Sequence, residues 1–140
     1  MTSESLVVPT GRMIELGREE SLALLASVPV GRIGFTGQAL PVVRLVNHLV
    51  DGDSSVIRTH PGSALLSATG IGQVVVYEAG CLDLHARIGW NVMVTGRAVP
   101  VTASSEAPRH RRLHIPWFDG AMDHVVQISA KTVTGHRLAR

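Results

Sequence analysis

Three residues near the middle of the chain have the chemistry of a phosphate-binding site. Arg58, Thr59 and Ser63 lie within the segment VIRTHPGSALL. A guanidinium is a permanent cation whose planar fork of N–H donors suits phosphate oxygens, and the two hydroxyls add further hydrogen bonds. Gly62 would let the backbone approach an anion closely at the start of a helix. The segment is a candidate phosphate site, with an ordinary polar loop as the alternative.

A predicted hairpin leads into this segment. Leu40–Val50 and Ser54–Thr59 are rich in β-branched and apolar residues, which indicates two strands. Asp51-Gly52 stands between them, and an Asp-Gly pair in that position favours a tight turn. Ser63–Ala68 is predicted to form one or two helical turns. The hydroxyl and guanidinium groups would then lie where the second strand gives way to a helix.

The remaining segments complete a mainly β protein. Short helices are predicted over Glu19–Ala26 and Ser104–Leu113, and residues 80–89 are predicted to form a loop. The six predicted strands are Val30–Thr36, Leu40–Val50, Ser54–Thr59, Gln73–Ala79, Trp90–Val101 and His124–Thr134. No connection has the long helix that parallel strands need. We therefore expect a six-stranded antiparallel β-barrel, with Gly96 bending the longest strand.

The composition limits the function classes. The 140 residues carry a formal net charge of +2, and 45% are hydrophobic. That charge is too small to indicate a nucleic-acid partner. Cys81 is the sole cysteine, which excludes an intramolecular disulfide. No secretory signal or membrane-length apolar run is seen, so we expect a cytoplasmic protein without a membrane partner. Residues 1–18 are predicted to be an N-terminal arm and residues 19–140 a single domain.

Four segments together resemble a known family. They are PVVRLVNHLVDG, VIRTHPGS, GWNVMVTGRAVPV and DHVVQISAKTVTGHRL. This succession is similar to that of the pyridoxamine 5′-phosphate oxidase-like proteins, and most of all to their short actinobacterial-type members. The resemblance implies a split β-barrel of the FMN-binding type. It also implies a homodimer whose two cofactor sites lie at the subunit interface, and oxidoreductase chemistry on a small-molecule substrate that the sequence does not specify.

The resemblance also assigns residues to the cofactor. Side chains on the second strand would lie along the isoalloxazine ring and ribityl chain. Those at the end of the third strand and in the loop after it would meet the phosphate. Those at the start of the long strand would contact the ring, where relatives often have a glutamine. The residues for the ring and ribityl chain are Arg44, Val46 and Asn47, and those for the phosphate are Arg58, Thr59 and Ser63. The residues at the start of the long strand are Trp90 and Asn91.

One position departs from the family pattern. Many relatives have Lys or Arg directly after the Ser or Thr of the helix-entry loop, and this chain has Ala64. The loss of a charge-assisted contact costs about 1.5–3 kcal/mol. Arg58 or Arg44 could compensate. The alternatives to FMN are therefore a deazaflavin coenzyme, used by a reductase, and a non-catalytic role in binding flavin or haem.

Four histidines are candidate metal or haem ligands. His110 and His114 are four residues apart on a predicted helix, which would place them on one face. Neighbouring arginines such as Arg109 would repel a cation, and no accompanying carboxylate motif is present. We therefore expect no metal site. His85 and His124 are possible haem ligands, although their spacing does not single them out.

Overall fold

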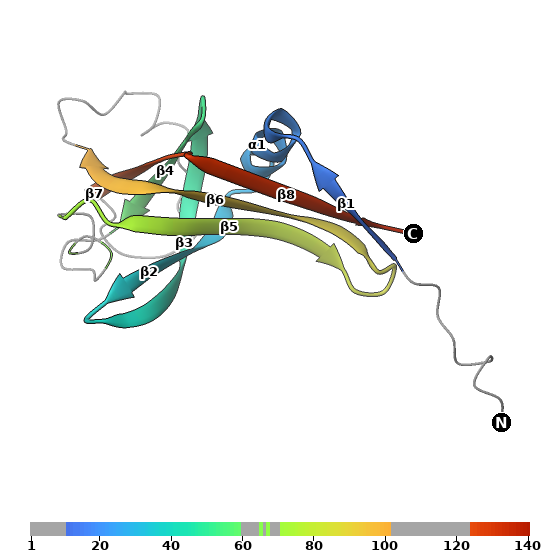
Figure 1. Ribbon diagram of the computed structural model, residues 1–140, viewed down its shortest axis with the longest axis horizontal. Helices are drawn as coiled ribbons and strands as arrows, with labels where there is room; N and C mark the ends of the chain where they lie inside the picture. The colour runs from blue at the N-terminus through green and yellow to red at the C-terminus, as the bar shows by residue number, and fades with distance from the viewer. Residues whose placement is uncertain (1–10, 60–64, 66, 68–70, 102–123) are drawn as a thin grey trace.

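The computed structural model describes residues 11–59, 65, 67, 71–101 and 124–140. Within them it has helix α1 and eight strands (Figure 1). Their bounds are β1 (Arg12–Leu16), α1 (Arg18–Ala26), β2 (Val30–Gly37), β3 (Leu40–Asp51), β4 (Ser54–Thr59), β5 (Val74–Asp83), β6 (Ile88–Val101), β7 (His124–Ser129) and β8 (Thr132–Ala139). The predicted helix Ser104–Leu113 lies outside the described residues.

Six of the strands close into a ring. The sheet order is β1-β8-β6-β5-β2-β3-β4-β7, and β7 pairs back onto β6. All the pairings are antiparallel. The predicted six-stranded antiparallel barrel is therefore confirmed. The hairpin β3–β4 turns at Gly52, whose φ of 63° is the left-handed conformation that an Asp-Gly turn requires.

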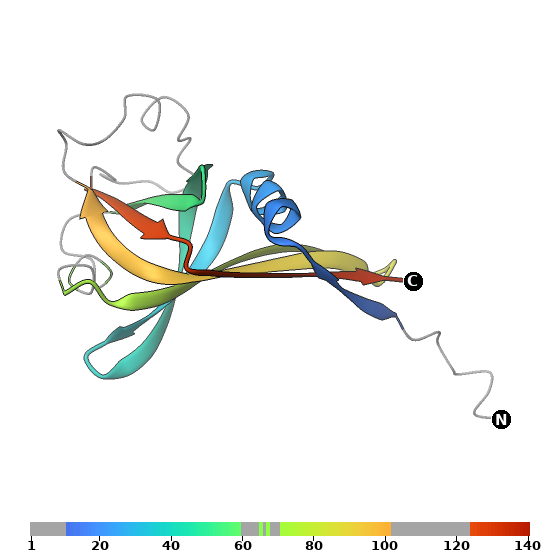
Figure 2. The same ribbon diagram turned by 45° about the horizontal axis from the view of Figure 1, so that its top comes forward.

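Strand β6 changes its pairing partner where it bends at Gly96. Residues Gly89–Thr95 pair with β8, whereas Ala98–Val101 pair with β7. The change of partner falls between these segments, where Figure 2 shows β6 curving around the barrel. A side chain at Gly96 would overlap the backbone carbonyl of Ser129. The predicted bend is confirmed, and close approach of the β7 backbone is its physical reason.

Two predicted boundaries are wrong. The loop predicted over residues 80–89 is instead a long hairpin, in which β5 and β6 pair from Val74–Arg97 to Asp83–Ile88. Its turn is fixed locally, since Asp83 accepts backbone hydrogen bonds from Ala86 (2.8 Å) and Arg87 (2.8 Å).

The last predicted strand, His124–Thr134, is divided into β7 and β8. Between the two strands the Lys131 N–H donates to the Thr95 carbonyl at 3.0 Å, and the chain passes from β7 in the ring to β8, which pairs with the next part of β6 outside the ring. In addition, residues Arg12–Leu16 of the predicted arm form β1, which pairs with β8 at the edge of the sheet.

The barrel interior is filled by side chains of all six ring strands. Ile33, Tyr77, Val92 and Ile128 are fully buried. Helix α1 covers this interior with Leu25, which is also fully buried. Figure 2 shows α1 packed over the sheet beside β8. The predicted helix over Glu19–Ala26 is thus confirmed.

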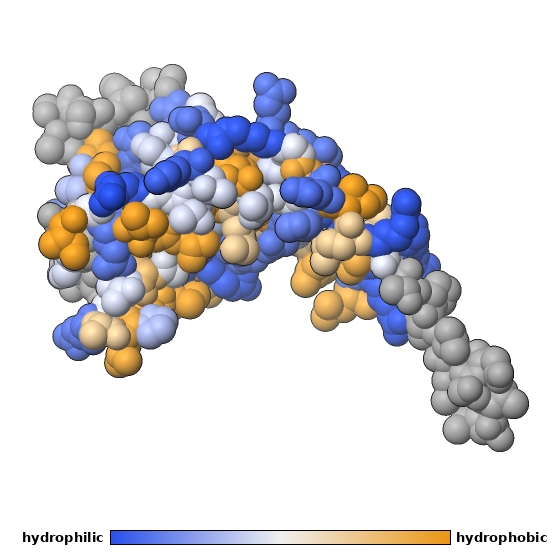
Figure 3. Space-filling model, in the orientation of Figure 1, coloured by the Kyte–Doolittle hydropathy of each residue, from blue (hydrophilic) through white to orange (hydrophobic). Residues whose placement is uncertain are grey.

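Part of the sheet continues past the ring. We call it the extension; it consists of Gly80–Asp83, Ile88–Asn91, β8 and β1. The side of the sheet that faces away from the barrel interior and α1 is called the outer face. Figure 3 shows the molecule as an arch, with apolar residues over its two ends, the β2–β3 hairpin and the end of the β5–β6 hairpin. In the extension, the paired ends of β5 and β6 therefore lie outside the barrel.

Candidate functional site

Five of the predicted site residues lie on β3 and β4. The β3–β4 ladder ends at the pair His48–Ile57, so Asn47 and Arg58 occupy the next positions along it. Asn47 and Thr59 are buried polar side chains, and Arg58 is half-buried. Val46 belongs to the hydrophobic core. A polar group enclosed in this way needs hydrogen-bond partners, and the cluster combines a cation, a hydroxyl and an amide at one end of the barrel.

Arg44 lines an open pocket. It is exposed on β3, and the pocket of about 440 Å³ also includes Ser67, Gln73 and Thr36. One guanidinium N–H donates to the Val43 carbonyl at 3.1 Å, and an arginine side chain has five N–H donors in all.

The wall of this pocket is fixed by Gln73. Its side-chain amide accepts from the Thr36 N–H at 2.6 Å and donates to the Thr36 carbonyl at 3.0 Å. Gln73 therefore pins the end of β2 to the start of β5. Sequence reasoning did not single out Gln73 or Ser67, because their relation to Arg44 depends on the closure of the sheet.

Several predictions fall on residues for which no structure is described. Ser63, the third predicted phosphate ligand, is among them, as are Ala64 and the helix-entry loop around it. The prediction that a cation is missing there therefore stays a prediction. Arg44 and Arg58, named as possible substitutes, both lie within the described residues on β3 and β4.

Trp90 and Asn91 lie at the other end of the sheet, in the extension. Trp90 pairs with Cys81 and Arg137, and Asn91 pairs with Gly80 and His136. Within the described residues, β2 pairs with β5 only from Arg32 to Gly34. Strands β2 and β3 therefore do not reach this part of β6, and one chain does not bring Trp90 and Asn91 beside the β3–β4 cluster.

The extension has a hollow on each side at these two residues. Trp90 lines both, one of about 340 Å³ with Arg137 and one of about 240 Å³ with Asn91 and His136. Apolar side chains such as Ile88, Leu82 and Leu138 line them beside a small number of polar ones. Such surfaces suit a ring system that is oriented by one or two polar contacts.

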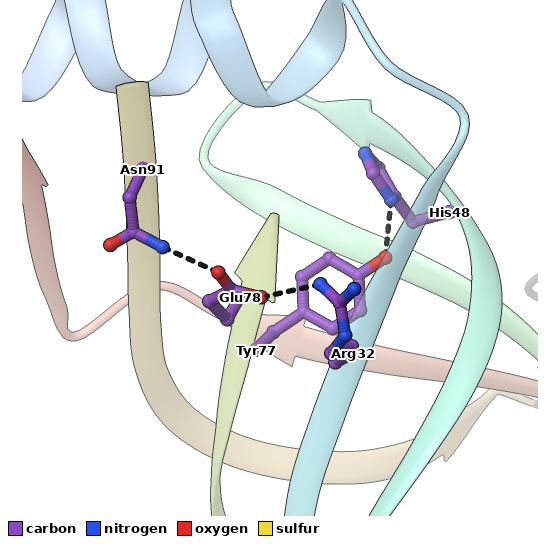
Figure 4. Close-up of polar contacts among 5 residues, drawn as sticks. All are labelled: Arg32, His48, Tyr77, Glu78 and Asn91. Atoms are coloured by element: carbon purple, nitrogen blue, oxygen red, sulfur yellow. Dashed lines mark hydrogen bonds and ion pairs between the residues drawn. The ribbon is translucent and has the colours of Figure 1, made fainter. Parts of the chain in front are cut away.

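Asn91 is tied to two further strands by a carboxylate. Its Nδ2 donates to Oε2 of Glu78 on β5, and Oε1 of Glu78 accepts from Arg32 Nη1 of β2 at 3.1 Å (Figure 4). Arg32 is more exposed than Glu78, whose side chain is 30% exposed. The three side chains form a continuous polar chain across β2, β5 and β6.

A second polar pair is enclosed in the barrel. His48 Nδ1 lies in hydrogen-bond contact with the Tyr77 hydroxyl, and His48 Nε2 lies 2.8 Å from the Leu25 carbonyl (Figure 4). Because a carbonyl only accepts, Nε2 must carry the proton and Nδ1 must accept from Tyr77. Burial lowers the pKa of His48, which its bond to Leu25 opposes, and burial together with Glu78 raises the pKa of Tyr77. Both residues are therefore neutral in the folded protein near neutral pH.

The pyridoxamine 5′-phosphate oxidase family matches residues 17–137 of this chain. The chain belongs to that family. The resemblance carried by its strand and loop motifs is thereby confirmed. A relative of this chain is the uncharacterized protein Rv0080 of Mycobacterium tuberculosis (strain ATCC 25618 / H37Rv). The two are 45% identical over 130 residues, which cover 90% of this chain and 86% of Rv0080.

Two solved structures share the fold with this pyridoxamine 5′-phosphate oxidase family member. The FAD-binding protein of Mycobacterium smegmatis is 28% identical with a TM-score of 0.69, over 90% of this chain and 98% of that protein. A putative pyridoxamine 5′-phosphate oxidase of Corynebacterium glutamicum is 24% identical with a TM-score of 0.74, over 91% and 94% of the two chains. At that identity the second likeness concerns the fold alone.

The other candidate ligands do not cluster. His85 lies in the turn of the β5–β6 hairpin, whereas His124 begins β7 and pairs with Thr59 at the opposite end of β6. Among the described residues, no three His, Cys, Asp or Glu side chains form a group that could hold a metal ion. His110 and His114 lie outside those residues. None of the described helices is long and apolar enough to cross a membrane.

Proposed function

We propose that this pyridoxamine 5′-phosphate oxidase family member binds FMN and acts as an oxidoreductase. The observation that carries the proposal is Arg44, a cation lining a pocket of about 440 Å³ together with the Ser67 hydroxyl. A guanidinium and a hydroxyl in an open pocket are suitable donors for a phosphate group. The 28% identical structure from Mycobacterium smegmatis, described as an FAD-binding protein, supports a flavin rather than an unrelated cofactor.

Side chains on β3 and β4 have the chemistry that a flavin phosphate requires. Arg44 and Arg58 supply permanent positive charge, and Thr59 supplies a hydroxyl on the strand that precedes the helix-entry loop. A bound flavin would supply the hydride or electron transfer. The residues of the chain would bind the phosphate, orient the ring and exclude water from it. We propose that the substrate is a small molecule that exchanges a hydride or electrons with the flavin.

The proposed site includes a second copy of the chain. Trp90 and Asn91 are assigned to the flavin ring, but within one chain they lie apart from the β3–β4 cluster. The outer face also carries large apolar side chains that a second copy could cover: Val43 (60% exposed), Leu45 (56%), Met93 (40%), Val74 (53%), Leu82 (64%) and Met13 (67%). A homodimer would bury this surface. It could also bring the extension of one copy to the β3–β4 cluster of the other.

Absorbance and ligand titration test the proposal. The purified protein is expected to bind FMN with a dissociation constant in the micromolar range or below and to show the bands of an oxidised flavin. Stronger binding of FAD or a deazaflavin would correct the cofactor, and a Soret band would favour haem. Absence of binding to all of them at about 100 μM would overturn the proposal.

A pair of variants tests the phosphate contact. Arg44→Met should weaken FMN binding by about 10- to 100-fold, the value of a charge-assisted contact, and should leave riboflavin binding nearly unchanged because riboflavin has no phosphate. Arg12→Met removes an exposed cation of β1 and serves as the control. Equal losses for FMN and riboflavin would remove Arg44 from the phosphate.

A further inference from the structure

Glu78 occupies the centre of the polar chain on the outer face. Each of its two carboxylate oxygens has a different partner: Oε1 accepts from Arg32, at 3.1 Å, and Oε2 accepts from Asn91. Arg32 and Glu78 are directly paired across β2 and β5. Asn91 lies diagonally across β6, since Glu78 itself pairs with Met93. Cross-strand and diagonal neighbours are within reach of such side chains.

This arrangement decides which end of the Asn91 amide meets the carboxylate. An ionised carboxylate only accepts hydrogen bonds, so the NH2 group must face Glu78. Figure 4 accordingly shows the amide oxygen of Asn91 on the side away from Glu78. A glutamine at position 78 could not impose this choice, because an amide both donates and accepts.

The ion pair with Arg32 makes the Glu78 carboxylate suitable for orienting the Asn91 amide. Arg32 balances the negative charge, so the chain holds Asn91 without placing an uncompensated charge beside a ligand. Leu45 and Met93 flank the ion pair in the same row of the sheet. Cover by a second copy or a ligand would strengthen these hydrogen bonds by excluding water.

We infer that Glu78 is a positioning residue for the ring of the bound flavin. It holds the Asn91 amide so that the carbonyl oxygen is presented to a hydrogen-bond donor of the ligand, such as the N3–H group of an isoalloxazine ring. The inference rests on the proposed function for its ligand. It adds Glu78 to the site, defines the orientation of the Asn91 amide, and implies selectivity for a ring that carries an N–H donor.

The orientation can be tested without a flavin. In ¹⁵N spectra of the wild-type protein, one Asn91 side-chain N–H should be shifted downfield and exchange slowly with water. Glu78→Gln should remove both signatures. Glu15→Gln makes the same chemical change on the exposed outer side of β1 and should leave them intact. Unchanged Asn91 signals in Glu78→Gln would overturn the inference.

The effect on the ligand is tested with FMN and N3-methyl-FMN, which lacks the donor. Wild type should prefer FMN by about fivefold, the value of one hydrogen bond, and Glu78→Gln should lose most of that preference. Glu78→Gln should have no further effect in an Asn91→Ala background, because Glu78 acts through Asn91. Additive losses would overturn the inference. If wild type binds no flavin, the proposed function fails, while the amide spectra still decide whether Glu78 orients Asn91.

Discussion

His48 and Tyr77 meet edge to face inside the barrel, with ring centroids 5.0 Å apart and an angle of 77° between the rings. His48 comes from β3, one residue after the candidate cofactor residue Asn47, and Tyr77 comes from β5 next to Glu78. Since His48 also bonds to the Leu25 carbonyl of α1, the pair joins three elements. It therefore supports both the cofactor strand and the strand that carries Glu78.

Removal of the tyrosine hydroxyl should destabilise the fold. Tyr77→Phe leaves His48 Nδ1 buried without a donor, so the free energy of unfolding should fall by about 1–3 kcal/mol. Urea denaturation followed by circular dichroism measures it. His48→Leu combined with Tyr77→Phe should cost less than the sum of the single changes, because neither polar partner then remains. Strict additivity would show that the two side chains do not interact.

Stability should depend on pH through His48. Burial lowers the pKa of His48 from its ordinary value of 6.5, so the unfolded chain binds the proton more tightly than the folded protein. The contribution of His48 to the free energy of unfolding should therefore fall as pH drops below about 6.5, and level off below the lowered pKa. Thermal unfolding between pH 7.5 and about 4.5 measures this.

Two variants isolate the source of that pH dependence. His48→Gln should flatten the decline, because it removes the buried titrating group. His85→Gln, at an exposed position in the β5–β6 turn, should retain it. A decline that is the same in wild type and His48→Gln would assign the effect to other groups.

Gly31 should not tolerate a side chain. A Cβ at this position would overlap the Tyr77 hydroxyl and the Glu78 carbonyl. Gly31→Ala should therefore lower the free energy of unfolding by about 1–3 kcal/mol, as overpacking does. Gly17 has no atom within 4 Å of such a Cβ, so Gly17→Ala should cost less than about 1 kcal/mol. Equal stability of the two variants in chemical denaturation would show that β5 can shift away from β2.

A charge on the outer face should disrupt the proposed homodimer. Leu45→Asp places a carboxylate among exposed apolar side chains and should raise the dimer dissociation constant by about 30-fold or more. Analytical ultracentrifugation of wild type and variant measures it. Val99→Asp, on the part of β6 that pairs with β7, is the control. A wild-type protein that is monomeric at about 100 μM would contradict the prediction.

Local signals in the sequence predicted much of the fold. Asp51-Gly52 specifies its turn through two adjacent residues, and Gly96 marks the bend of β6. The turn after Asp83 was not predicted, because the segment 80–89 has a glycine at each end and its composition is typical of a loop. In the structure Gly80 and Gly89 lie within paired strands. Backbone pairing, rather than composition, determines that hairpin.

The candidate site was predicted only in part, since its partners are distant in the chain. Arg44 and Asn91 were identified through family motifs. Glu78 and Gln73 gave no such signal, because their roles depend on Asn91 and Thr36, which other strands supply. Tyr77 offered a usable clue: a tyrosine within the apolar run VVVYEA implies a buried hydroxyl that needs a partner. The sequence did not show that the partner would be His48.

The bend at Gly96 also affects how the protein unfolds. Strand β6 pairs with β5 on one side and with β8 or β7 on the other along most of its length. The ring and the extension share this strand, so neither can open widely without disturbing the other. Backbone amides of β6 should therefore be among the slowest to exchange with solvent. Strand β1 is at the edge of the sheet that the described residues form, so its amides should exchange early.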